Sequence, residues 1–87
     1  MQSIKVKISN STGLHARPAT LLVKKASSFK SDISIESNGK KVNAKSLIGI
    51  LSLGATKDTE ITVITSGEDE VEAVNELVKL IETLEEY

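Results

Sequence analysis

Apolar and polar residues alternate along four short stretches of the 87-residue chain. In the first stretch, Ile4, Val6 and Ile8 are separated by single lysines, so one face of an extended segment would be apolar. The dipeptide Asn38–Gly39, which is typical of a tight hairpin turn, stands between two of the other stretches. The pattern predicts half-buried strands over residues 3–9, 32–37, 41–43 and 60–65.

Three further segments place their apolar residues at helical spacing. They cover residues 16–29, 45–54 and 66–84, with Ser66 as the candidate N-cap of the last. The apolar faces are expected at Ala19, Leu22, Ala26 and Phe29 in the first segment and at Val71, Val74, Val78 and Ile81 in the third. The order βαββαβα predicts an α+β fold in a single domain over 1–87. We expect a two-layer, open-faced β-sandwich, with a four-stranded antiparallel sheet covered on one face by three helices.

The middle helical segment has two apolar faces. At about 100° per residue, Leu47, Ile48 and Leu51 cluster on one side, and Ile50 and Leu53 on the other. A helix at the periphery of a small domain buries one face, so we expect Ile50 and Leu53 in the core. The other three residues would then form an exposed apolar patch, which is typical of a partner-binding surface. The alternative is a helix buried on both faces.

The composition excludes several classes of site. There is no cysteine, one histidine and only two aromatic residues, so disulfides, thiolate-bound metals and a conventional transition-metal site are not expected. A stacking platform for nucleic acid is also missing. Neither of the common glycine-rich nucleotide-binding motifs occurs. Because the chain shows no secretory signal and no apolar run near the roughly 20 residues of a membrane span, we expect a cytoplasmic protein without membrane insertion.

Positive and negative residues are segregated along the chain. Residues 1–57 hold ten Lys and Arg against two acids, and residues 58–87 hold one lysine against ten acids. Two compatible interpretations remain open. The two parts attract each other inside the fold, or a basic face that includes Arg17, Lys24 and Lys45 meets an acidic partner or a phosphate group.

The only histidine, arginine and proline of the chain lie within residues 10–22. Pro18 fits the first turn of a helix, which places His15 at or near the N-cap and Ala16 and Arg17 just inside. The amides of Ala16 and Arg17, the helix dipole and the guanidinium would together form an anion site. A neutral imidazole nitrogen is a nucleophile, so His15 is the candidate acceptor of a phosphoryl group. A lone histidine at a helix start is, however, more often only a surface or capping residue.

Hydroxyl side chains stand before two of the expected helices. Ser11 and Thr12 precede the histidine and are expected to add donors to the anion site. Ser46 is a good N-cap for the middle helix, worth about 1 kcal/mol. Phosphorylation of Ser46 would instead place a dianion beside the expected apolar patch. The capping role is the simpler interpretation, and both stay open.

Three motifs, TGLHARPA at 12–19, NGKKVNAKS at 38–46 and SLGA at 52–55, resemble the histidine-containing phosphocarrier protein HPr of the bacterial phosphoenolpyruvate:sugar phosphotransferase system. The resemblance spans essentially the whole chain. It implies a phosphoryl carrier that is not itself an enzyme, acts as a monomer and needs no cofactor or metal. His15 would accept a phosphoryl group on Nδ1 from phospho-enzyme I and pass it to enzyme IIA domains of sugar permeases, with Arg17 stabilising the phosphate.

The resemblance also implies regulation and docking. Ser46 matches the serine that HPr kinase/phosphorylase modifies in low-GC Gram-positive relatives, where a transcriptional regulator is a further partner. The docking surface is expected at Thr20, Leu47, Ile48 and Leu51. Gram-positive relatives often carry methionine at the positions of Ile48 and Leu51, but the patch stays apolar here. The alternative is a regulatory binding module in carbon or nitrogen control, acting mainly through Ser46 and this patch. The intact His15 and Arg17 argue against it, except for a nitrogen-related branch that keeps both.

Overall fold

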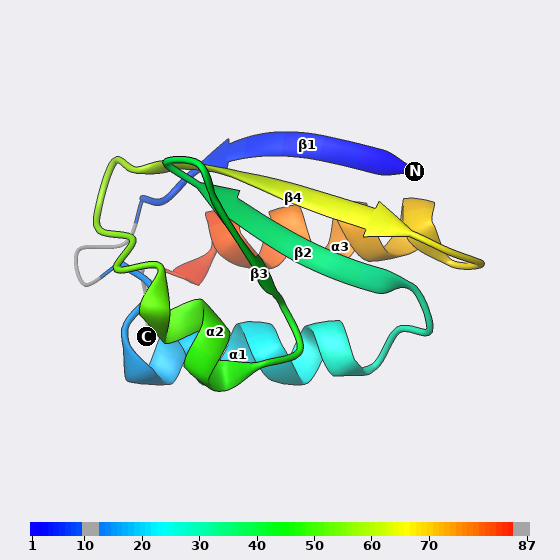
Figure 1. Cartoon of the computed structure of the whole chain (residues 1–87), viewed down its shortest axis with the longest axis horizontal. Helices are drawn as coiled ribbons and strands as arrows, with labels where there is room; N and C mark the ends of the chain where they lie inside the picture. Colours follow the sequence, from blue (N-terminus) through cyan, green and yellow to red (C-terminus); the bar gives the residue numbers. More distant parts are fainter. Residues whose placement is uncertain (10–12, 85–87) are drawn as a thin grey trace.

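The computed structural model describes residues 1–9 and 13–84. Its elements follow the predicted order βαββαβα (Figure 1). They are β1 Gln2–Lys7, α1 Ala16–Ser27, β2 Asp32–Ser37, β3 Lys40–Asn43, α2 Leu47–Ser52, β4 Glu60–Ser66 and α3 Glu70–Glu82. The α+β class is therefore confirmed, and the predicted elements differ from the observed ones only at their ends.

The four strands form one antiparallel sheet in the order β1-β4-β2-β3. One row of neighbours across the sheet is Ile4, Val63, Ile35 and Val42, and the adjacent row is Lys5, Thr62, Glu36 and Lys41. Because successive side chains of a strand point to opposite faces, the first row faces the helices and the second faces solvent. In Figure 1, α3 passes behind the strands, with α1 and α2 below. The open-faced arrangement is confirmed.

The core lies between the sheet and the helices. Its largest fully buried aliphatic side chains are Ile8, Leu22, Ile35, Ile50, Ile61, Leu77, Ile81 and Leu84. All four apolar residues predicted for the inner face of the first helical segment are buried, although the last of them, Phe29, lies beyond the end of α1. In α2, Ile50 is fully buried and Leu53 packs partly buried against the core, as predicted. Burying each such side chain contributes about 1.5–3 kcal/mol, so α2 is held mainly by its inner face.

The predicted start of the third helix was wrong. Helix α3 begins at Glu70 with Asp69 as its N-cap, whereas Ser66 is the last residue of β4. The Glu70 amide donates to the Gly67 carbonyl at 3.3 Å, which closes a turn between strand and helix. Val71, predicted for the apolar stripe, is consequently 56% exposed. The buried stripe of α3 consists of Ala73, Val74, Leu77 and Ile81.

The carboxylate of Asp69 fixes the loop between α1 and β2. It accepts hydrogen bonds from the backbone amides of Lys30 and Ser31, both at 2.9 Å, and from the Ser31 hydroxyl. These bonds, the hydroxyl contributing most, stabilise the ionised form and lower the pKa of Asp69 from 3.8 to about 2. A single residue therefore links the start of α3 to a loop 38 positions earlier in the chain.

Ion pairs join the basic first part of the chain to the acidic last helix region. Lys25 pairs with Glu76 at 3.2 Å, and Lys30 with Glu68 at 3.9 Å. The intramolecular interpretation of the charge segregation holds for these residues. Exposed pairs of this kind contribute at most about 1 kcal/mol each, so they add little to the stability of the fold.

Candidate functional site

His15 is the N-cap of α1, as predicted. Its backbone is extended, with φ −89° and ψ −172°, and its carbonyl accepts a hydrogen bond from the Ala19 amide at 2.8 Å. Pro18 lies in the first turn, where a missing N–H group is tolerated. The imidazole is exposed and makes no capping hydrogen bond within the described residues. Its ring nitrogens are thus accessible to another molecule.

Two backbone donors of the first turn of α1 directly follow His15 in the chain. The amides of Ala16 and Arg17 have no acceptor within the helix, because the hydrogen-bonding pattern of an α-helix leaves its first amides without partners. Both residues are exposed. With the positive end of the helix dipole, these amides favour an anion at this position. A phosphoryl group carried by His15 would be stabilised there.

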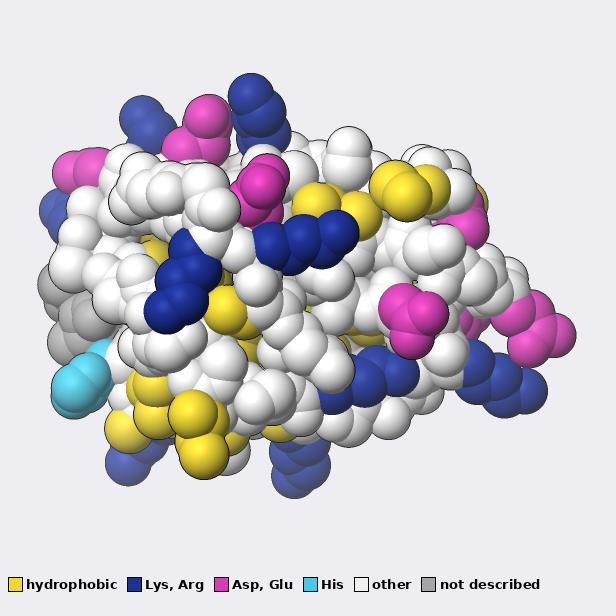
Figure 2. All heavy atoms as spheres, in the orientation of Figure 1, with side chains coloured by type: hydrophobic (Ala, Val, Ile, Leu, Met, Phe, Trp, Pro, Cys, Tyr) yellow, Lys and Arg dark blue, Asp and Glu magenta, His cyan; other side chains and the backbone are white. Residues whose placement is uncertain are grey.

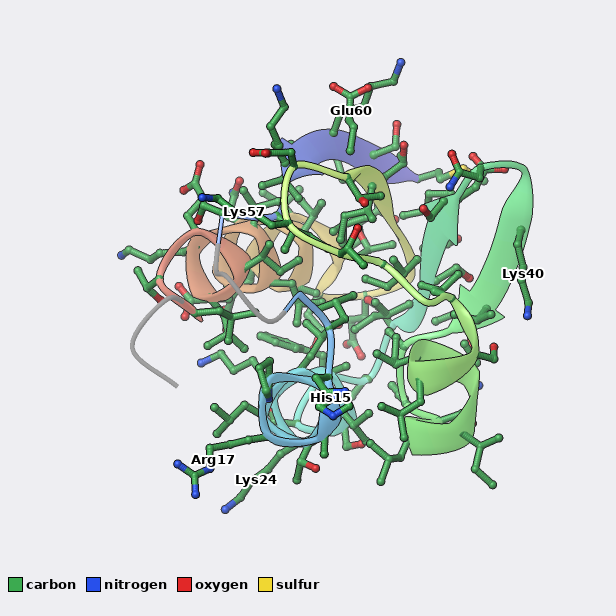
Figure 3. The ribbon with its side chains drawn as sticks, turned by 90° about the vertical axis from the view of Figure 1, so that its left-hand side faces the viewer. His15, Arg17, Lys24, Lys40, Lys57 and Glu60 are labelled. Carbon is green, nitrogen blue, oxygen red and sulfur yellow. The ribbon has the colours of Figure 1, made fainter. Side chains whose placement is uncertain are left out.

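The Arg17 side chain does not approach the imidazole. Figure 3, which looks toward the start of α1, shows the His15 ring on the side of α1 that faces α2. The Arg17 guanidinium extends in the other direction, as does Lys24 (Figure 3). The structure therefore places the two predicted residues in one turn but does not bring their functional groups together. Ser11 and Thr12, the predicted extra donors, lie outside the described residues.

The two residues before His15 are fixed by the loop that follows α2. Leu14 is buried, and its amide donates to the Ala55 carbonyl at 2.9 Å. Gly13 has a φ of 65°, and a Cβ added there would lie 2.3 Å from the Ala55 oxygen. Only glycine permits this approach. The sequence motifs that contain these residues did not predict that they touch. This contact ties the position of His15 to the loop that follows α2.

Helix α2 presents an exposed apolar surface close to His15. Leu47, Ile48 and Leu51 are 39%, 82% and 40% exposed, and we call these three residues the α2 patch. Figure 2 shows hydrophobic side chains gathered over this region beside the histidine. Thr20 is also exposed, and its hydroxyl donates to the Ala16 carbonyl at 2.8 Å. The predicted exposure is confirmed, and a role in partner binding stays a prediction.

Ser46 is the N-cap of α2. Its Oγ accepts a hydrogen bond from the Gly49 amide at 3.1 Å, which confirms the predicted cap. A Cβ on Gly49 would lie 3.3 Å from that Oγ, so glycine leaves space around the hydroxyl. The neighbouring Lys45 donates from Nζ to the Phe29 carbonyl at 2.9 Å. Lys45 is thus engaged inside the fold and is not a free member of the predicted basic face.

The described residues hold little else that resembles a catalytic centre. Among residues 1–9 and 13–84, no three His, Cys, Asp or Glu side chains come together as a metal site. None of the helices in this part of the chain has the length and apolar character needed to cross a membrane. A hollow of about 610 Å³ lies on the outer face of the sheet, near Lys5, Glu36 and Glu60, and contains no residue of the His15 region. This hollow is therefore separate from the His15 region.

Comparison with known protein families gives a match that covers nearly the whole chain. The sequence model of the PTS-HPr family, described as the PTS HPr component phosphorylation site, matches residues 2–83. Among curated proteins, the HPr-like protein Crh of Bacillus subtilis (strain 168) is 49% identical over 78 residues, which cover 90% of this chain and 92% of that protein.

Solved structures agree with this match. HPr-C-His from Thermoanaerobacter tengcongensis is 47% identical with a TM-score of 0.95, covering 100% of this chain and 98% of that chain. An HPr dimer from the same organism is 49% identical with a TM-score of 0.76, covering 95% of each chain. The similarity to HPr-C-His therefore covers the complete fold. Because the second protein is a dimer, the monomer expected here stays a prediction.

Proposed function

Since this chain belongs to the HPr family of the phosphotransferase system, we propose that it is a phosphocarrier that holds a phosphoryl group on His15. The main support is the exposed imidazole at the N-cap of α1, next to the first-turn amides. Phospho-enzyme I would supply the group, and enzyme IIA domains of sugar permeases would receive it. The chain would be modified and regenerated in each cycle without turning over a small substrate itself.

The transfer step exchanges one bond to phosphorus for another. Nδ1 of the neutral His15 ring attacks the phosphorus atom as the donor's bond to phosphorus breaks, and the donor keeps that electron pair. The amides of Ala16 and Arg17 would hold the phosphoryl oxygens in place. Arg17, which faces solvent in the present structure, would rotate toward the phosphate and form paired hydrogen bonds. Delivery to an enzyme IIA domain is the same step with the roles reversed.

The α2 patch is the surface proposed to receive these partners. It lies beside His15 and is apolar, so docking there would bring the partner's reactive group over the imidazole and exclude water from it. Arg17, once turned toward the phosphate, would favour an acidic partner at the edge of this contact. Because imidazole and patch belong to one chain, a monomer would be sufficient for the relay.

A second role is proposed for Ser46. Its Oγ lies at the start of α2 with space left by Gly49, and a phosphate there would add charge directly next to the α2 patch. HPr kinase/phosphorylase would add the group from ATP, and the modified form would repel acidic docking partners and present a new surface to a transcriptional regulator. A chain that acted only through Ser46 would be a regulatory module in carbon or nitrogen control.

The relay is tested by incubating the protein with phosphoenolpyruvate and a bacterial enzyme I, followed by intact-mass measurement. We expect a gain of one phosphoryl group that is lost in mild acid, because the nitrogen–phosphorus bond is acid-labile. His15→Ala should show no gain, and Ser46→Ala should gain the group normally. No gain in the wild type, with an enzyme I that accepts carriers from several species, would contradict the relay.

The regulatory role is tested separately with ATP and HPr kinase/phosphorylase. We expect an acid-stable gain of one phosphoryl group in the wild type and in His15→Ala, but not in Ser46→Ala. The modified protein should then accept the phosphoryl group from enzyme I more slowly. A wild type that the kinase leaves unmodified would count against the role of Ser46 and would leave the relay untouched.

A further inference from the structure

Helices α1 and α3 leave a shallow groove between them. Two adjoining hollows of about 360 and 300 Å³ share Lys25 and Leu80 as lining residues. In Figure 3, α3 lies above α1 and α2 lies to its right, and no residue of the α2 patch lines the two hollows, so the groove is separate from that patch. We call it the α1–α3 groove, and none of its lining residues belongs to the phosphoryl site or the α2 patch.

The two helices line this groove with matching spacing. The lining residues are Leu21, Lys24, Lys25 and the C-cap Ser28 on the α1 side, and Glu76, Lys79, Leu80 and the C-cap Thr83 on the α3 side. In each helix they occupy positions i, i+3, i+4 and i+7, which form one continuous face. Leu21 and Leu80 are both partly buried and pack against the core, so they form an apolar floor. The groove is therefore a two-turn channel with charged rims.

Most polar groups of the groove are already used within the chain. The Ser28 hydroxyl donates to a carbonyl of its own helix at 2.6 Å, and the Thr83 hydroxyl does the same at 3.0 Å. Glu76 is paired with Lys25. A sugar or a nucleotide, which is recognised through several directed hydrogen bonds, would find few partners here.

The groups that remain are aliphatic or positively charged. Lys24 and Lys79 are exposed and enter no ion pair among the described residues, and they stand on opposite rims of the apolar floor. The Arg17 side chain extends to the same side of α1 as Lys24 and continues the positive edge (Figure 3). An occupant that satisfies this surface carries aliphatic side chains between carboxylates.

We propose that the α1–α3 groove binds an acidic amphipathic helix of a partner protein. Two aliphatic side chains one turn apart on that helix would fit over Leu21 and Leu80, in the way a helix lays its apolar face into a groove. Carboxylates beside them would meet Lys24 and Lys79. This surface would act in addition to the proposed relay, and it needs neither a phosphorylated histidine nor the α2 patch.

The probe is a synthetic helical peptide with leucines at i and i+4 and glutamates at the flanking positions. It is titrated into the isotopically labelled protein and followed by NMR. We expect saturable shifts of Leu21, Lys24 and Leu80 signals, with the α2 patch unaffected. The double variant Lys24→Glu/Lys79→Glu should weaken binding at least tenfold and should bind a charge-reversed peptide with lysines in place of glutamates.

The control for net charge is Lys5→Glu/Lys7→Glu, two exposed lysines on β1 that lie outside the groove. It should bind the acidic peptide as the wild type does. Three outcomes would each overturn the proposal. The control variant could lose as much affinity as the groove variant, the wild type could bind the charge-reversed peptide equally well, or the shifts could be confined to the α2 patch. All four substituted positions are exposed, so loss of folding does not confuse these outcomes.

Two further measurements test the apolar floor of the groove and the nature of its occupant. The variant Leu80→Gln, checked for intact folding by circular dichroism, should bind the acidic peptide at least fivefold more weakly than the wild type. An unchanged affinity would overturn the apolar part of the proposal. A chain that ends at Leu84 should bind the peptide as the full chain does. Markedly tighter binding by the shortened chain would assign the groove to the chain's own acidic end and overturn a partner helix as its occupant.

Discussion

Ile48 offers the sharpest test of the docking surface, because it is the most exposed residue of the α2 patch. It is 82% exposed in the free protein, so its side chain contributes little to folding and is available to a partner. Substitution Ile48→Ala removes three carbon atoms and leaves the backbone of α2 unchanged. We expect this variant to fold normally, within about 0.5 kcal/mol of the wild type, and to bind enzyme I more weakly.

The expected loss follows from the exposed fraction. Each buried carbon group contributes about 0.8 kcal/mol, so three contribute about 2.4 kcal/mol when fully removed from water. Docking can bury no more than the 82% that is exposed, which leaves about 2 kcal/mol. At 1.4 kcal/mol for each factor of ten, the dissociation constant should rise about 30-fold.

The assay is calorimetric titration of enzyme I into each variant, together with the rate of phosphoryl transfer to His15. For Ile48→Ala we expect a higher KM for phospho-enzyme I with little change in kcat, because the imidazole is untouched. The control is Val71→Ala, a truncation at an apolar residue that is 56% exposed on α3. A change below threefold for Ile48→Ala, or equal weakening for Val71→Ala, would refute the assignment of the docking surface to α2.

Three further predictions concern stability. Gly13→Ala should lower the free energy of unfolding in urea by about 1–3 kcal/mol, because the new Cβ meets the Ala55 oxygen and φ stays at 65°. Gly39→Ala, with a φ of 82° but open space, should cost less. Asp69→Asn should be less stable than the wild type above about pH 4. The pKa of Asp69 is lowered to about 2, so this difference should close as pH falls from about 4 through 2. Ser46→Ala should lower the melting temperature by about 4–8 °C through loss of a cap worth about 1 kcal/mol, whereas Ser46→Asp, which keeps an acceptor, should melt close to the wild type.

Features that depend on neighbouring residues could be predicted from the sequence. Pro18 set the start of α1, and Ser46 with the apolar spacing after it set the start and inner face of α2. The third helix shows where this fails. Ser66 precedes acidic residues and matches the pattern of an N-cap, but it pairs with Asp32 across the sheet and so remains in β4. Strand pairing between distant segments overrides a local capping preference.

The candidate site divides in the same way. The placement of His15 at the helix start follows from residues within a few positions of it, and it was predicted correctly. The direction of the Arg17 side chain was not predictable, because an exposed, flexible side chain has no packing that selects one rotamer. The contact of Gly13 with Ala55 joins residues 42 positions apart, and nothing in either motif alone indicates that they touch.

That contact provides a physical route by which the two proposed phosphorylation sites would influence each other. The α2 helix begins at the cap made by Ser46, and the loop that follows it holds the backbone immediately before His15. The α2 patch lies on this helix, between the Ser46 cap and the Ala55 loop. A change at Ser46 would therefore reach the imidazole in two ways, through charge beside the proposed docking surface and through the position of the Ala55 loop. The two routes differ experimentally, because added salt screens the first but not the second. If transfer to His15 in a Ser46-phosphorylated protein recovers fully at high salt, charge alone accounts for the coupling, and a residual defect would assign the remainder to the loop.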